Sequence, residues 1–375
     1  MALGATVSAV HAQTATPDPH ALPPELAALL AATPRWSSSV AADGAIGYKD
    51  NLLLSHAGGE RSAFARLAVE ALVLHLPNGR TDYFGFVNAE ARRYFSGDAV
   101  DHEAQAVAQA EWRYEVKDMF KFAFDLKGYH LDQIFDVSDT DVRRDVAALK
   151  LSGAAAGPTL RWTIRPGWWL EAEALGKRET YEDGLNNSRI GDGALRVGWT
   201  CGTHFEVSVT AAQRARDFDR RVQYTAGGRE RDGTHLRIRE REAESRFDVT
   251  WDAAARWKTR TRAGVLWYAD NGSGYFDYRQ RKVAQELEWH SGNWAVQIEG
   301  SAKRLDFDVQ TVGIGIFPPR RVKDEFAAQL RIERKVTERW TLFAEYSWER
   351  SRSNDPFASY VVNEGLLGAR WSWEK

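Results

Sequence analysis

The stretch RWTLFAEYSWERS, residues 339–351, alternates between two kinds of side chain. Every second residue from the first tryptophan is apolar or small, namely Trp340, Leu342, Ala344, Tyr346 and Trp348. The residues between them are mostly polar and include Glu345 and Glu349. A period of two predicts a β-strand. A soluble protein would turn the apolar face towards a core, whereas a membrane barrel would turn it towards lipid and the charged face towards a lumen.

The same alternation recurs along the chain. It is clear in HEAQAVAQAEWRYEV (102–116), FKFAFDLKGY (120–129), NWAVQIEGSAK (293–303) and EFAAQLRIERK (325–335). Counting such segments from Trp36 to Trp373 predicts about sixteen strands. An even number would bring both ends of the strand region to the same rim.

The predicted connections alternate between two lengths. Short ones with turn residues occupy 77–80, 117–119, 165–167, 201–204, 290–293 and 336–339. Longer and more polar ones occupy 50–60, 134–141, 182–190, 220–232, 310–320 and 352–357. This alternation indicates periplasmic turns on one rim and extracellular loops on the other.

In one segment, 142–165, the apolar residues do not stay on the same alternate positions, so the two-residue pattern changes face. Leu149 and Leu151 have the opposite parity to Leu160, Trp162 and Ile164. We expect a bulge near Gly157-Pro158 to restore the alternation.

Tryptophans gather near the short connections. Those expected to form an aromatic girdle at the membrane surface are Trp168, Trp199, Trp251, Trp257, Trp289, Trp294, Trp340 and Trp371. Indole prefers the headgroup level of a bilayer. The alternative is a soluble sandwich with tryptophan in its core, but small outward residues such as the Ala104 to Ala110 series favour contact with lipid tails. We therefore predict an all-β fold, a transmembrane antiparallel up-and-down β-barrel of about 16 strands, formed by residues 36–375.

Composition is consistent with this fold. The 375 residues carry a net charge of −2, which gives no bulk attraction to nucleic acid, and Cys201 is the sole cysteine, so no intrachain disulfide can form. No apolar run reaches the ~18–20 residues of a membrane helix. Residues 1–12 resemble the end of a signal peptide, and 13–35 form a Pro- and Ala-rich segment with one short helix expected after Pro24. A plain linker is the other interpretation of that region.

Two stretches resemble a known family. AEYSWERSRSNDPFASYVVNEGLLGARWSW (344–373) resembles the final hairpin of Gram-negative outer-membrane barrels of the β-barrel porin type, and GYKDNLLLS (47–55) resembles their first strand and loop. The resemblance implies location in the outer membrane, contact with outer-membrane lipid and recognition by the barrel-assembly machinery. The chain departs from the family pattern because its last aromatic residue, Trp373, is followed by Glu374 and Lys375.

Few residues indicate chemistry. His130 with Asp132 and Asp136 is the best candidate acid–base cluster, although an ordinary polar rim is the favoured interpretation. No His or Cys spacing fits zinc, and we expect neither a metal, a cofactor nor catalysis. The charge run 227–246 contains Arg229, Arg231, Arg237, Arg239 and Arg241. It is either a solvated loop or a site for anionic sugars and lipopolysaccharide phosphates.

The charged faces predict the lining of a lumen. Its candidate residues are Glu111, Arg113, Glu171, Glu173, Lys258, Arg260, Arg262, Glu286, Glu288, Glu299, Lys303, Arg331, Glu333 and Glu345. The basic stripe at 258, 260 and 262 could face Glu286 and Glu288. These rows would either set a transverse field for small polar solutes or form neutral ion pairs along the wall.

The expected function is a porin-like channel for passive diffusion of small polar solutes. The alternatives are a pore of a polysaccharide or polymer export system and a non-conducting structural or receptor barrel. A homotrimer is possible. No connection is long enough to predict a constriction inside the lumen, so we expect narrowing from charged side chains or from 13–35.

Overall fold

The computed structural model describes residues 35–375 except 57–58, 79, 97–99, 118 and 141–145. The predicted leader and residues 13–34 of the predicted Pro- and Ala-rich segment therefore lie outside the described residues. Among those that are described, no helix is long and apolar enough to cross a bilayer.

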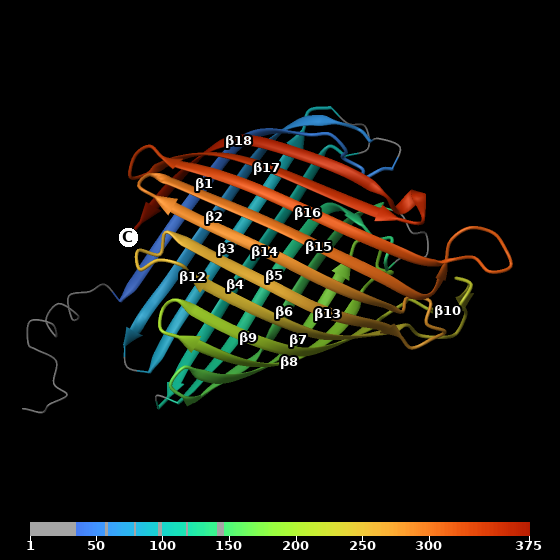
Figure 1. Cartoon of the computed structure of the whole chain (residues 1–375), viewed down its shortest axis with the longest axis horizontal. Coiled ribbons are helices and arrows are strands. Elements are labelled where there is room, and N and C mark those ends of the chain that lie inside the picture. Colours follow the sequence, from blue (N-terminus) through green and yellow to red (C-terminus); the bar gives the residue numbers. More distant parts are fainter. Residues whose placement is uncertain (1–34, 57–58, 79, 97–99, 118, 141–145) are drawn as a thin grey trace, which may run out of the picture. The chain divides into compact units, whose positions relative to one another are not determined.

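Sixteen of the described strands close into one antiparallel barrel, which confirms the predicted fold (Figure 1). The strands are β1 (Trp36–Lys49), β2 (Ser62–Asn78), β3 (Thr81–Tyr94), β4 (His102–Val116), β5 (Phe120–Asp136), β6 (Val146–Arg165), β7 (Trp168–Tyr181), β8 (Ser188–Cys201), β9 (Phe205–Phe218), β12 (Arg237–Thr250), β13 (Trp257–Asp270), β14 (Tyr278–Ser291), β15 (Trp294–Thr311), β16 (Arg320–Lys335), β17 (Trp340–Ser353) and β18 (Tyr360–Glu374). The pair β10 (Gln223–Tyr224) and β11 (Glu230–Arg231) forms a separate small sheet between β9 and β12, and a short 3₁₀ helix, η1 (Pro356–Ala358), precedes β18.

The barrel is closed by hydrogen bonds between its first and last strands. In that seam Ala42 of β1 lies opposite Trp371 of β18. The two connection lengths separate onto two rims, as predicted. In Figure 1 the C-terminus and the tight turns lie on the left, and the long connections lie on the right. The sequence did not predict the long connections at 95–101 and 271–277.

Contacts between strands that are not neighbours identify the inside. Arg66 of β2 lies 3.8 Å from Glu345 of β17, and Arg92 of β3 lies 2.9 Å from Glu364 of β18. Each pair spans three steps around the barrel. Side chains can meet over that span only on the concave side, because on the convex side they diverge.

The apolar face is therefore the outer face. Large apolar side chains with the opposite parity are exposed, for example Leu67 (69%), Leu367 (63%) and Leu342 (52%). In the stretch 339–351, Trp340 and Tyr346 are also exposed, whereas Phe343 and Glu345 lie inside. The arrangement of a soluble protein is reversed, as transmembrane barrels require.

The predicted bulge near Gly157-Pro158 is wrong. β5 and β6 keep one register through this point, with Phe124 opposite Pro158, and the irregularity lies between Thr163 and Arg165 instead. Leu151 is buried on the inward face. The apparent change of parity thus comes from apolar residues that truly point inward near the outer rim.

Several large inward aromatic side chains lie opposite a glycine on the neighbouring strand. The pairs are Phe64 with Gly47, Tyr129 with Gly153, Trp169 with Gly198, and Phe343 with Gly368. A Cβ at Gly368 would lie 2.5 Å from the Phe343 ring and 2.6 Å from the Gly44 carbonyl oxygen. Each glycine therefore lets a ring lie flat against the wall instead of filling the lumen.

We predict that Gly368→Ala destabilises the barrel by about 1–3 kcal/mol, because the new methyl group overpacks against Phe343 and the backbone. Guanidinium unfolding of the refolded protein, followed by heat-modifiable electrophoretic mobility, measures this change. The control is Gly44→Ala, since a Cβ there meets nothing within 4 Å. Equal stabilities for the two variants would contradict the packing role of Gly368.

Candidate functional site

The predicted basic stripe on β13 lies on the inward face and is paired along the wall. Arg260 donates to Asp248 on β12 at 2.7 Å and to Glu286 on β14 at 2.9 Å. Arg262 reaches Glu299 at 3.4 Å. The two rows of charge therefore meet as neighbours on adjacent strands, which is the ion-pair arrangement, rather than facing each other across the barrel.

The other predicted lumen residues also have inward parity. Arg196 donates to Glu171 at 2.6 Å, and Lys303 lies 3.1 Å from Glu325. Arg331 forms ion pairs with both Glu333 (2.7 Å) and Glu345 (2.9 Å). Glu111 contacts Arg113. The remaining inward candidates are Glu173, Lys258 and Glu288. Acidic and basic groups thus alternate around the interior and compensate one another locally.

The interior keeps open space between these charges. A cavity of about 750 Å³ lies along β4, β5, β7 and β9, and charged side chains from each of these strands line it, including Glu111, Asp125, Glu173 and Arg214. A further cavity of about 330 Å³ follows the wall from β7 to β14 and includes Asp192 and Lys282. Such polar-lined space suits hydrated solutes and does not suit an apolar ligand.

One long hairpin end extends beyond its neighbours at the outer rim. β5 and β6 stay paired up to Asp136 opposite Val146. Pairing of β5 with β4 ends at Asp132, and pairing of β6 with β7 ends at Leu151. We call residues 136–140 of this hairpin end the strap.

The strap is anchored by three cations. Lys323 of β16, which is fully buried, lies 2.8 Å from Asp136 and 3.1 Å from Asp139. Arg321, also fully buried, donates to the Ser138 carbonyl oxygen at 2.7 Å. Arg221, from the connection between β9 and β12, donates to the carbonyl oxygen of Thr140 at 2.6 Å.

These anchors lie far from β5 around the barrel. β5 and β16 are seven steps apart in one direction and nine in the other, so they form opposite walls. The strap therefore crosses the outer mouth. The expectation that no connection folds across the lumen is wrong, because the described residues 137–140 extend an overlong hairpin and reach β16.

Burial shapes the protonation of the strap. Removal from water raises the pKa of Asp139 above its usual range, and the adjacent Glu325 and Asp136 carboxylates add to this rise, whereas Lys323 and Arg321 oppose it. The two cations therefore oppose the protonation of this carboxyl group that burial favours.

Two apolar clusters flank the strap on the inward side. One combines residues of β9 and β12–β15 with their connections: Phe218, Tyr224, Leu236, Ile238, Tyr268, Tyr275, Phe276, Tyr278, Leu305 and Phe307. The other combines β1–β3 with β17 and β18: Ala45, Leu52, Phe64, Tyr94, Val100, Phe343 and Leu366. Together with the strap they narrow the outer mouth.

Sequence reasoning missed the strap anchors. Arg321 and Lys323 continue the inward parity of the strand at 325–335, so their side of the wall could have been found from the pattern. Their partners could not, because Lys323 and Asp139 are 184 positions apart and meet across the lumen.

The predicted girdle tryptophans lie near the short-turn rim. The ring centroids of Trp168 and Trp199 are 6.2 Å apart, those of Trp257 and Trp289 are 5.9 Å apart, and Trp340 is opposite Trp371. Trp251 and Trp294 are exposed. Trp169 is different, because it is buried on the inner face with the Arg161 guanidinium 4.0 Å from its ring centroid.

The structure does not assemble the candidate acid–base cluster. His130 contacts Ser152 at 2.9 Å, and Asp132 contacts His102 (3.3 Å) and Lys150. Asp136 instead belongs to the strap inside the mouth. Within the described residues, no group of three or more His, Cys, Asp or Glu side chains could hold a metal ion.

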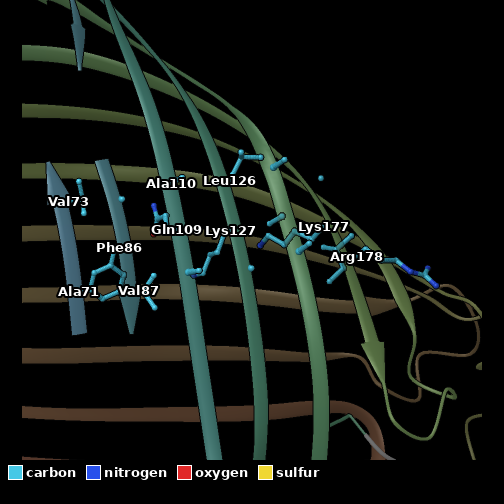
Figure 2. Close-up of a pocket in the computed structure, with 18 of the residues that line it drawn as sticks. Ala71, Val73, Phe86, Val87, Gln109, Ala110, Leu126, Lys127, Lys177 and Arg178 are labelled. Carbon is cyan, nitrogen blue, oxygen red and sulfur yellow. The ribbon is translucent and has the colours of Figure 1, made fainter. Parts of the chain in front are cut away.

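The outer wall is thin over β2 to β8. A shallow hollow of about 990 Å³ is lined there by many small side chains, among them Ala108, Ala110 and Gly128 (Figure 2). Figure 2 shows Ala110 and Leu126 on neighbouring strands of this wall. The small side chains at this hollow let lipid chains approach the backbone closely, and Arg178 and Arg189 lie at its edge towards the outer rim.

An apolar outer band, tryptophans at the short-turn rim, a charged interior and the two classes of connection define one class of protein. The chain is a β-barrel of the Gram-negative outer membrane. The sequence matches no protein-family model and no curated protein.

Three solved structures are similar to this chain at low sequence identity. OccAB4 of Acinetobacter baumannii is 8% identical, with a TM-score of 0.49 over 92% of this chain and 99% of its own. OmpT, an outer membrane protein of Vibrio cholerae, is 11% identical, with a TM-score of 0.46 over 91% and 98%. The outer membrane protein opdK of Pseudomonas aeruginosa is 8% identical, with a TM-score of 0.45 over 90% and 99%. At such low identity the similarity concerns the fold, and the class assignment stands on the barrel's own geometry.

We predict that Lys323→Met releases the strap, because it leaves Asp136 without its buried cation and leaves Asp139 with Arg321 alone, at 3.7 Å. Loss of one partner of a buried ion pair costs about 3–5 kcal/mol. Hydrogen exchange of the strap amides should accelerate by on the order of 100-fold or more, if exchange follows local opening. Lys335→Met, on the same strand at the opposite rim, is the control, and unchanged exchange in Lys323→Met would show that the ion pairs do not hold the strap.

Proposed function

We propose that this barrel is a passive channel for small hydrated polar solutes, with its narrowest part at the outer mouth beneath the strap. The observation that carries the proposal is the charged interior with open space along the wall. A barrel of sixteen strands is wide enough for an aqueous lumen unless something fills it. Carboxylates and guanidinium groups lining that lumen can replace part of a solute's hydration shell.

The pairing of the wall charges supports passive rather than selective binding. Arg260 is held between Asp248 and Glu286, so its positive charge is largely compensated at short range. A path of this kind offers many weak polar contacts and no strong binding site for a single ion. Solutes could then enter and leave quickly, which conduction requires.

The strap disfavours the polymer-export alternative. A polysaccharide would need a continuous wide path, and the strap crosses the mouth between opposite walls with Asp139 bound to Lys323. We expect no catalysis.

A closed barrel is the second candidate. The full burial of Arg321 and Lys323 favours it, since a mouth that leaves these cations inaccessible to water has little free cross-section around them. The strap would then be a plug, and any solute path would depend on its release.

Planar-bilayer recordings separate the two candidates. An open channel should give discrete steps for the natural chain and larger steps for Lys323→Met, because the strap no longer narrows the mouth; Lys335→Met should match the natural chain. Silence of the natural chain with steps only in Lys323→Met would support the plug. Silence of both would sink the channel proposal.

Ion selectivity tests whether the basic stripe faces the path. We predict that Arg260→Glu combined with Arg262→Glu shifts the reversal potential towards cation selectivity, because two inward positive charges become negative. The matched control is Arg350→Glu with Arg352→Glu, two exposed residues with outward parity on β17. An equal shift of the reversal potential in both variants, or no shift in either, would show that the basic stripe does not face the solute path.

A further inference from the structure

An arginine cluster lies on the outward face of the barrel, away from the lumen. Its members are Arg239 and Arg241 on β12 and Arg279 and Arg281 on β14. Their neighbours in sequence settle the direction. Ile238 and Tyr278 belong to the apolar cluster inside the mouth, so the next residues, with the opposite parity, point outwards. All four arginines are exposed.

Trp267 of β13 lies between the two arginine-bearing strands. It is the register partner of Arg241 on one side and of Arg279 on the other. Tyr268, its neighbour, is inside the mouth, so Trp267 points outwards and is 42% exposed. The three side chains therefore form a row across adjacent strands, which lie side by side on the near wall in Figure 1.

The height of this row matches the outer membrane surface. Trp257 and Trp289 lie near the short-turn rim, and Trp267 follows Trp257 by ten residues along β13. At about 3.3 Å per residue and a tilt of roughly 40°, the row stands about 25 Å above that rim, which equals the apolar band of such barrels. The outward residues of β12 and β14 between the two levels are uncharged: Ala243, Ser245, Phe247, Val283, Gln285 and Leu287.

These arginines lack a counter-ion within the described part of the chain. None of the four forms an ion pair or hydrogen bond there, although other outward arginines do. Asp306 is opposite Arg279 but pairs with Arg304 at 3.1 Å. Arg281 is directly opposite Arg304, another cation on the outward face. Like charges in direct register are unfavourable unless an anion bridges them.

We propose that this arginine cluster binds the phosphate groups of the glycolipid that forms the outer leaflet, with Trp267 at the headgroup level between the arginines. Guanidinium groups pair with phosphate through two parallel hydrogen bonds. The phosphates of such a lipid lie at the boundary of its acyl chains, which is the level of the row. Charge complementarity and height therefore both favour the lipid phosphates as the ligand. In this proposal the arginine cluster takes the place of the loop residues Arg229 and Arg231, which the sequence had suggested for phosphate binding.

The site does not depend on the channel proposal, since it lies on the opposite face of the wall. If the lipid-site proposal fails, the lipid-binding measurement contradicts it and the conductance measurement is unaffected. If the channel proposal fails, the conductance measurement contradicts it and the lipid-binding measurement is unaffected.

The test uses the full chain in detergent with purified bis-phosphorylated lipid A as the probe and its dephosphorylated form as the comparison. Native mass spectrometry measures the lipid bound per chain. The test variant is Arg239→Gln, Arg241→Gln and Arg279→Gln combined. The matched control removes three positive charges near the opposite rim, by Arg334→Gln, Lys335→Gln and Arg339→Gln. Heat-modifiable mobility confirms that both variants are folded.

We expect the natural chain and the control to prefer the phosphorylated lipid, and the test variant to bind it on the order of 100-fold more weakly, since each cation near an anionic surface contributes about a fivefold factor. A variant with lysine at the three positions should bind at an intermediate level, because lysine keeps the charge without the paired donors. Equal binding of both lipids by the natural chain, or equal loss in test and control variants, would overturn the proposal. So would a change of oligomeric state in the test variant with lipid binding intact, which would assign the arginines to a second copy of the chain.

Discussion

Within the hydrocarbon layer no water is present to pair with the backbone, and every peptide group must therefore find its partner inside the protein. A sheet meets that requirement only if it has no edge, so the seam between β1 and β18 is the feature on which the rest depends. Once the sheet is closed, each strand has one face towards lipid and one towards the lumen. Alternate side chains along each strand then face two different environments, lipid on one side and the lumen on the other.

The interior shows how charge is tolerated in a confined space. Carboxylates and guanidinium groups occupy neighbouring strands at hydrogen-bonding distance, as around Arg260, instead of gathering into regions of one sign. At the outer mouth the same chemistry serves a different purpose. There, Lys323 and Arg321 hold the strap between opposite walls, and both cations are buried, with the Arg321 guanidinium over the Phe307 ring of an apolar cluster. Low local dielectric strengthens such pairs and makes the loss of one member costly.

The outer surface is not uniform either. From the short-turn tryptophans upwards, β12 and β14 are free of outward charge for the height of the apolar band, and cations then appear at the level of Trp267. A purely apolar outer wall would make contact with lipid tails alone. Arginines at this height add a polar contact to the membrane surface, and they do so without using any group that lines the lumen.

The sequence by itself determined the architecture, the number of barrel strands and the direction of most faces. Alternation in 339–351 and the two connection lengths are local properties, set by the geometry of one strand and one turn, so they are legible without the rest of the chain. Local pattern failed at 142–165, where Leu151 is apolar yet points inward opposite another apolar residue, Leu131 of β5. Only the tertiary structure could place Lys323 against Asp139, Phe343 flat over Gly368, and Arg241 and Arg279 on either side of Trp267. These contacts depend on inter-strand register and on closure, which bring together residues that no short-range periodicity relates.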